Sequence, residues 1–152
     1  MPTDRRAYLF ALAPTLVVVA VGPVLALLDP FAVSAVGPLR VVGVPFVLAG
    51  LGLVGWAVHT FARAGVPPAP ATEPESLVTA GALAHTRNPL YLGTVVAAGG
   101  VAVLLASPVT AAYAGLLWLA YHLLALYEEE PALRAAFGDA HADYCESTPR
   151  WL

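Results

Sequence analysis

The sequence predicts an all-α membrane protein that crosses the bilayer about four times and ends in a short amphipathic helix. Composition is the first observation: of the 152 residues, 59% are hydrophobic and 11% are charged, whereas soluble domains carry about 25% charged residues. The second is the distribution of the charges, which leaves three long uncharged stretches. The length suggests one domain, 1–152.

The three uncharged stretches account for four spans. Ala7 to Leu28 and Val41 to Ala62 are 22 residues each, and Asn88 to Tyr127 is 40 residues. A span needs about 20 apolar residues, because each helical residue covers about 1.5 Å of a 30 Å hydrocarbon layer. The first two stretches therefore fit one helix each, and the third fits two. Ser107 and Pro108 lie at the midpoint of the third, where a tight connection belongs.

The N-terminal stretch could instead be a cleaved signal peptide, with Arg5 and Arg6 before the apolar run. That run exceeds the roughly 7–15 residues of a signal sequence, so we favour a retained span. Four spans leave only Arg40 on one side and put six arginines on the other, so the positive-inside rule places both termini in the cytoplasm. The six are Arg5, Arg6, Arg63, Arg87, Arg134 and Arg150. No basic patch suggests a nucleic-acid partner.

The first two spans, within 1–64, are expected to be scaffold. The second contains Gly50, Gly52 and Gly55, small residues that allow a neighbouring helix to approach closely. The loop that follows, 65–76, holds four prolines and should be extended rather than helical. Pro89 suits the first turn of the third span, where its missing N–H is no loss.

The fourth span ends in three acids, Glu128–Glu130, and Pro131 is expected to break or kink the helix there. Beyond it, apolar and aromatic side chains recur at spacings of four, four and three. This pattern predicts a short amphipathic helix on the membrane surface, although Gly138 weakens it. The residues of the pattern are Leu133, Phe137, His141 and Tyr144.

Two clusters of polar residues stand out because the rest of the chain is mostly apolar. One, 85–93, precedes and begins the third span, and the other, 127–133, follows the fourth. Because the two spans form a hairpin, both clusters should end on the same side of the membrane. Arg87 would then meet the carboxylates of Glu129 and Glu130. A guanidinium and carboxylates together suit a zwitterionic small molecule.

These clusters resemble the motifs of a known family. Residues 87–93, R-N-P-L-Y-L-G, look like the R-[HN]-P-x-Y-x-G motif of the isoprenylcysteine carboxyl methyltransferase and phospholipid methyltransferase superfamily. Residues 129–138 resemble its E-E-x-x-L-x-x-x-F-G motif, and Tyr144 with Pro149-Arg150-Trp151 matches its closing elements. The resemblance covers about 65–152. It implies a methyltransferase region there, formed by the loop, the two-span hairpin and the C-terminal segment.

The resemblance also implies S-adenosylmethionine as the cofactor and a lipidic acceptor that arrives from the bilayer. It assigns catalytic roles to Arg87, Glu129 and Glu130. The candidate cofactor-binding residues are the same two glutamates with His85, Asn88, Pro89, Tyr91, Leu92, Gly93 and His122. His122 lies on the helix face of Glu129 but could equally be a packing histidine. Glu128 is expected to be solvated. The scattered histidines show no metal-ligand spacing, so we expect no metal.

Several functions remain open at this point. The acceptor could be a prenylated cysteine carboxylate, which needs no base, or a phospholipid amine, which must first lose a proton. The chain could also be a non-catalytic membrane scaffold, because many relatives carry an arginine shortly before the glutamate pair, where this chain has Leu124–Tyr127. A transporter is the third alternative, and the absence of charged residues within the spans disfavours it.

Overall fold

The computed structural model describes residues 5–31, 34–66 and 76–152, and these residues form helices and connecting segments without a β-strand. Four long helices dominate. They are α1 (Arg5–Leu27), α2 (Gly43–Ala64), α3 (Pro89–Leu105) and α4 (Pro108–Leu124). Shorter helical segments are the 3₁₀ helices η1 (Ser34–Val42) and η2 (Gly81–Ala84), the π turn η3 (Ala125–Glu129), and α5 (Glu130–Phe137) and α6 (Asp139–Ser147).

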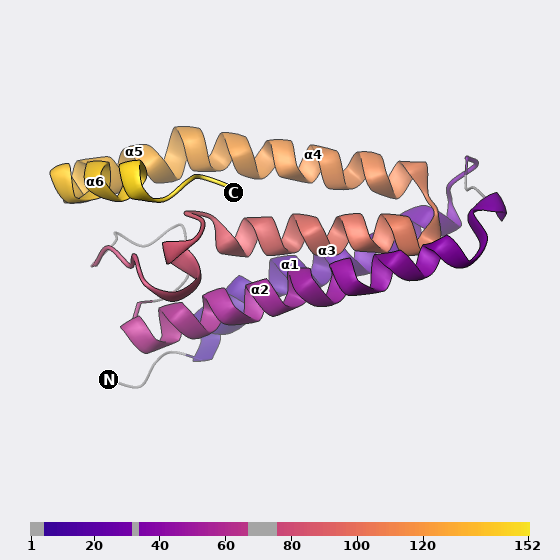
Figure 1. The fold of residues 1–152 in the computed structure, drawn as a ribbon, viewed down its shortest axis with the longest axis horizontal. Helices are drawn as coiled ribbons and strands as arrows, with labels where there is room; N and C mark the ends of the chain where they lie inside the picture. The colour runs from indigo at the N-terminus through magenta and orange to yellow at the C-terminus, as the bar shows by residue number, and fades with distance from the viewer. Residues whose placement is uncertain (1–4, 32–33, 67–75) are drawn as a thin grey trace.

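The four long helices alternate in direction, and α3 lies between α4 and the pair α1 and α2 (Figure 1). As a result, the start of α1, the end of α2, the start of α3 and the end of α4 all lie at one end of the bundle. Helices α5 and α6 lie at the same end, and the C-terminal tail turns back beside α4 (Figure 1). The arrangement brings the two polar clusters to one end, as the hairpin argument requires.

Helices α2 and α3 pack through glycines that face each other's backbone. A Cβ atom on Gly50 would lie 2.5 Å from the backbone nitrogen of Ala97 and from the carbonyl oxygen of Gly93. A Cβ on Gly93 would lie 2.7 Å from the carbonyl oxygen of Gly50. The expected packing role is therefore found at Gly50. It is wrong for Gly52 and Gly55, which lie on the exposed side of α2 and would meet nothing within 4 Å.

The connection between α3 and α4 is as tight as the sequence predicts. Ala106 ends α3 in the left-handed conformation (φ 51°), and the Ser107 side chain caps α4 by accepting from the Thr110 N–H at 3.1 Å. The Ser107 hydroxyl in turn donates to the Asp29 carboxylate, which also accepts from the Val109 N–H at 3.0 Å. Asp29 thereby ties the segment after α1 to the start of α4.

The region around Pro131 differs from the expectation. The chain stays helical from Pro108 to Phe137, and the disturbance takes the form of the π turn η3 just before the proline. Pro131 cannot donate to the carbonyl of Tyr127, and its ring would collide with that carbonyl in a regular α-helix, so a wider turn relieves both problems. The single C-terminal helix is also interrupted: Gly138 (φ 51°) separates α5 from α6.

Two helical stretches in the described residues are long and apolar enough to cross a membrane. They are Gly37–Ala64, with 28 residues, and Pro108–Phe137, with 30. Thr15–Leu27 and Pro89–Leu105 are apolar but shorter. The prolines of 67–74 lie outside the described residues.

Candidate active site

The turn before α3 is held by contacts with α2 and α6. Gly81 has a positive φ of 61°, and a Cβ there would lie 2.5 Å from the hydroxyl oxygen of Thr60 on α2. The same hydroxyl accepts from the N–H of Ala82 at 3.3 Å. On the other side, the buried Tyr144 of α6 donates its hydroxyl proton to the carbonyl of Leu83 at 2.6 Å. These contacts fix the chain that leads into Arg87.

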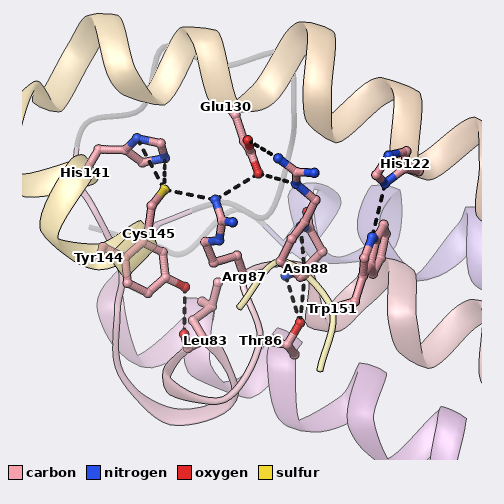
Figure 2. A network of polar contacts seen from close by, with 11 residues as sticks. Leu83, Thr86, Arg87, Asn88, His122, Glu130, His141, Tyr144, Cys145 and Trp151 are labelled. Carbon is pink, nitrogen blue, oxygen red and sulfur yellow. Dashed lines mark hydrogen bonds and ion pairs between the residues drawn. The ribbon is translucent and has the colours of Figure 1, made fainter. Parts of the chain in front are cut away.

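Arg87 and Glu130 meet directly (Figure 2), and Arg150 is the third member of the network. Nη1 of Arg87 lies 2.9 Å from Oε1 of Glu130, and both side chains are 14% exposed. Arg150 binds the same carboxylate with two parallel bonds, from Nε to Oε1 at 2.7 Å and from Nη2 to Oε2 at 2.8 Å. A two-pronged guanidinium–carboxylate contact is the strongest geometry that such a pair adopts.

Further contacts surround Arg87. Its Nη1 also lies 2.9 Å from Sγ of Cys145, and that sulfur lies 3.6 Å from Nε2 of the buried His141. Nε of Arg87 is buried and has no hydrogen-bond partner among the described residues. Arg87 therefore keeps one unsatisfied donor within an otherwise well-connected network.

The C-terminal tail supplies backbone acceptors to the turn before α3. The carbonyl of Arg150 accepts from the Thr86 hydroxyl and from Nδ2 of Asn88, both at 3.1 Å. The carbonyl of Pro149 accepts from the backbone N–H of Arg87 at 3.0 Å. The tail thus contacts three consecutive residues of the first cluster.

Glu129 has a different environment from Glu130. It accepts a hydrogen bond from the Tyr91 hydroxyl, and the ring of Tyr91 stacks on that of Tyr121 with centroids 4.3 Å apart. No arginine of the described chain contacts Glu129. Both acids lie beyond Tyr127, the last residue of the uncharged stretch, so they fall outside the apolar part of the helix.

The two acids differ in proton affinity for the same reason. Burial raises the pKa of Glu129 above its ordinary value, against the hydrogen bond from Tyr91, and the charge of Glu130 adds to the rise. Burial acts on Glu130 too, but the hydrogen bonds from Arg150 and the charges of Arg87 and Arg150 outweigh it and lower its pKa. Two arginines therefore balance the charge of the Glu130 carboxylate, whereas no cation of the described residues pairs with the Glu129 carboxylate.

A set of aromatic side chains lies beside this network, on the side of α4. Trp151 donates its ring N–H to Nδ1 of His122 at 3.2 Å, and His122 stacks on Trp118 with centroids 5.4 Å apart. The centroids of Trp118 and Trp151 are 6.3 Å apart. The C-terminal tail therefore reaches from the turn before α3 to the face of α4.

Comparison with known proteins identifies the family. Residues 39–140 match the family described as phospholipid methyltransferase. The chain belongs to this family. The match covers α2, α3, α4 and most of the C-terminal helices, and so includes both polar clusters. The recognition made from the two motifs is thereby confirmed. The search of curated proteins found no match, and neither did the search of solved structures.

Membership makes the chain a membrane methyltransferase of the lipid-modifying kind. The apolar helices Gly37–Ala64 and Pro108–Phe137 agree with the membrane location. No group of three or more His, Cys, Asp or Glu side chains in the described part is placed to hold a metal ion.

The structure brings most of the candidate residues of this methyltransferase together. Arg87, Asn88 and Glu130 share one network through the tail, Tyr91 joins Glu129, and His122 joins Trp151. Glu128 is exposed, as expected. The catalytic and cofactor-binding roles themselves stay predictions.

The other four candidate residues take no part in these polar contacts. His85 is exposed and packs on Trp56 of α2 with ring centroids 5.5 Å apart, outside the Arg87 network. Gly93 faces Gly50 and Val54 of α2, so the close approach that it allows is between helices. Pro89 is buried at the first turn of α3, as predicted, and Leu92 is half-buried on the same helix.

Sequence reasoning left several contributors out of the site, among them Arg150, Trp151, Thr86, Tyr121 and Cys145. The first two belong to the terminal Pro-Arg-Trp element, whose match to the family was a signal that they contribute. Thr86 directly precedes the first motif. Tyr121 lies within an apolar span, and nothing in the sequence distinguishes it from an ordinary interface aromatic.

The donor set fits a small molecule that carries both a carboxylate and positive charge. The orphaned Nε of Arg87 is a donor for an anionic group. Glu129, which lacks a cation, is an acceptor for a positive group, and the hydroxyl of Tyr91 contacts it. S-Adenosylmethionine has this combination of charges.

Proposed function

We propose that the protein transfers a methyl group from S-adenosylmethionine to a lipidic acceptor at the membrane interface. Family membership supports the methyltransferase class. The observation that carries the proposal is the unequal pairing of the two glutamates: two arginines neutralise Glu130, and Glu129 is left beside them without a cation. Such a carboxylate favours a cationic ligand, and the donor is a sulfonium.

In this proposal the residues bind and orient, and little acid–base chemistry is required of them. Arg87 binds the donor's carboxylate through its free Nε, and Glu129 binds a positive group. Glu130 and Asn88 hold the surrounding backbone and Arg87 in place. The bound donor supplies an electrophilic methyl group. Positioning and exclusion of water are then the main sources of rate enhancement.

The membrane arrangement that we propose has four spans, α1 to α4, and both termini in the cytoplasm. The alternating helix directions and the gathering of both clusters at one end support it (Figure 1). The chain forms one domain, with residues 1–64 as scaffold and 65–152 as the catalytic region. Helices α5 and α6, divided at Gly138, take the place of one amphipathic helix at the membrane surface.

Two acceptor classes are compatible with this site. One is a prenylated cysteine carboxylate, by the resemblance to isoprenylcysteine carboxyl methyltransferase. The other is a phospholipid amine, which the family description favours. An amine must lose a proton before it attacks, and in this case Glu129, whose pKa is raised by burial, would accept that proton. A carboxylate acceptor needs no such base.

Calorimetry with S-adenosylhomocysteine tests the proposal. Purified protein in detergent should bind this demethylated product, which keeps the carboxylate and ammonium of the donor. Arg87→Ala and Glu129→Gln should each weaken binding by about tenfold or more, equivalent to about 1.4 kcal/mol. Glu128→Gln is the matched control, since Glu128 is exposed on the same acidic run and should bind within about twofold of wild type. Folded wild-type protein that binds nothing would refute the proposal.

A non-catalytic scaffold is the alternative, and one observation favours it: the network of Arg87, Glu130 and Arg150 is largely satisfied without a ligand. Membranes that contain the protein would be incubated with a donor carrying a labelled methyl group. Label in any lipid or protein fraction that depends on Glu129 would exclude the scaffold. The chemical identity of the labelled species would also decide between the two acceptor classes.

A further inference from the structure

We infer that Arg150 is a positioning residue of this site, which fixes Glu130 and the 86–88 turn relative to each other. The inference rests on the proposed function, because the site that it positions is the one proposed to bind the methyl donor. It concerns the C-terminal tail, which lies outside the residues 39–140 that match the family.

Arg150 joins two parts of the chain by two different means. Its side chain binds both carboxylate oxygens of Glu130, at the start of α5. Its carbonyl oxygen accepts from Thr86 and Asn88, before α3. A single residue therefore sets the distance between the two predicted clusters. The residues on either side reinforce it, since Pro149 binds the Arg87 N–H and Trp151 binds His122.

The contact between Arg150 and Glu130 also determines which nitrogens of Arg87 are hydrogen-bonded. Arg150 occupies both oxygens of Glu130, whereas Arg87 reaches Oε1 through Nη1 alone. This division leaves Nε of Arg87 without a partner among the described residues. Without Arg150, Arg87 would be the remaining guanidinium in contact with Glu130, and it would be drawn toward that carboxylate. Arg150 thus keeps Arg87 available for a ligand.

The charged groups around Glu130 give the positioning role of Arg150 a pH dependence that can be measured. The groups that face it are Arg87 before α3, Arg150 in the tail, His141 on α6 and the adjacent Glu129. Cys145 on α6 lies against Arg87. The hydrogen bonds from Arg150 and the charges of both arginines hold the pKa of Glu130 below its ordinary value. Loss of Arg150 should raise that pKa and with it the pH at which the network falls apart.

The experiment compares Arg150→Gln, Arg150→Lys and the control Arg134→Gln in detergent-purified full-length protein. Arg134 is an exposed arginine on α5. The dissociation constant for S-adenosylhomocysteine is measured by calorimetry between about pH 5 and 8. Arg150→Gln should weaken binding about tenfold and move the acid side of the pH profile to higher pH. Arg150→Lys should restore the pH profile but only part of the affinity, because an ammonium cannot form the two-pronged contact.

A second measurement needs no ligand. Amide hydrogen exchange of the peptide that contains residues 86–88 should be faster in Arg150→Gln than in wild type, because the Arg87 N–H donates to the tail. Arg134→Gln should leave the exchange and the affinity near neutral pH at wild-type values. Wild-type affinity, pH profile and exchange in a folded Arg150→Gln protein would overturn the inference.

The two measurements separate failure of this inference from failure of the proposed function. If the wild type binds no S-adenosylhomocysteine, the proposed function fails, and the exchange data alone decide whether Arg150 positions the turn. If the wild type binds and Arg150→Gln changes neither readout, only the positioning role fails. Should Arg150→Gln not fold, Arg150→Lys supplies the comparison, since it keeps the charge and loses the geometry.

Discussion

Helix α3 is packed against α2 and against α4 by different means. Toward α2 it presents Gly93 and Gly100, and a Cβ on either would come within 3 Å of α2 backbone atoms. Toward α4 it presents Tyr91, which stacks on Tyr121, and Ala98, which packs with Ala114. Only Thr110 and Ala114 of α4 are buried, so most of that helix is exposed.

Polar contacts at the ends of the bundle make up for the sparse packing of α4. At one end, the Asp29 carboxylate binds Ser107 and the Val109 N–H and so caps the start of α4. At the other, Arg87, Glu130 and Arg150 form a charged network. In the proposed function, the α2–α3 contact is scaffold, and the site lies where polar groups join α3 to α4.

The largest effect is expected from Glu130→Ala. The variant leaves two guanidiniums facing each other in a mostly buried position, and removal of one partner from a buried ion pair costs about 3 kcal/mol or more. Thermal unfolding in detergent should show a much lower midpoint than in wild type. Glu128→Ala, on the exposed neighbour, should change little. Equal midpoints for the two variants would show that the charged network does not hold α4.

The α2–α3 contact is tested by a matched pair in one helix. Gly50→Ala places a methyl group 2.5 Å from two backbone atoms of α3, which cannot move aside as a side chain could. Overpacking of this kind costs about 1–3 kcal/mol. Gly52→Ala meets nothing within 4 Å and should be neutral or slightly stabilising, since alanine favours the helix. Equal thermal midpoints for the two variants would contradict the close packing.

The sequence predicted the structural features that depend on local residue patterns. Charge spacing located the four long helices, and Ser107-Pro108 marked the turn between the last two. The sequence could not say which face of α2 meets α3, because Gly50, Gly52 and Gly55 are alike as residues and differ only in the direction in which they point. It also could not show that Pro131 is accommodated by a π turn, since a proline can also kink or end a helix.

The site was predictable in outline for the same reason. A hairpin must bring its two ends together, so the meeting of Arg87 with Glu130 followed from topology. The contribution of Arg150 did not follow from topology, because a C-terminal tail can fold back along many paths. The path that it takes depends on hydrogen bonds such as those that the Pro149 and Arg150 carbonyls accept. His85 shows the reverse case: it adjoins the motif in sequence, yet its ring lies on Trp56 of α2.

The end of the bundle that Asp29 caps should be less sensitive than the charged end, where Arg87, Glu130 and Arg150 lie. Asp29→Ala removes the acceptor for Ser107 and for the Val109 N–H, and loss of a helix cap costs about 1 kcal/mol. The thermal midpoint should fall modestly. Binding of S-adenosylhomocysteine should stay at the wild-type value when measured well below that midpoint. Weakened binding in this variant would mean that the two ends are coupled through α4.

The smallest effect is a pH dependence that arises at His141. Burial lowers the pKa of His141 below its ordinary value of 6.5, the charges of Arg87 and Arg134 add to this, and Glu130 opposes it. The unfolded chain therefore takes up a proton before the folded protein does. Stability is fully present above about pH 6.5 and declines as the pH falls toward the lowered value.

Thermal midpoints measured at intervals between about pH 7.5 and 5.5 should show this decline in the wild type. It should persist in His59→Gln, which replaces an exposed histidine on α2. In His141→Gln the midpoint should be nearly constant over that interval, because the group that binds the extra proton on unfolding is gone. At lower pH a second decline should remain in both variants, since the lowered pKa of Glu130 means that its stabilisation is lost as that carboxylate is protonated. A decline near pH 6 that survives in His141→Gln would assign the proton uptake to a group outside the charged end.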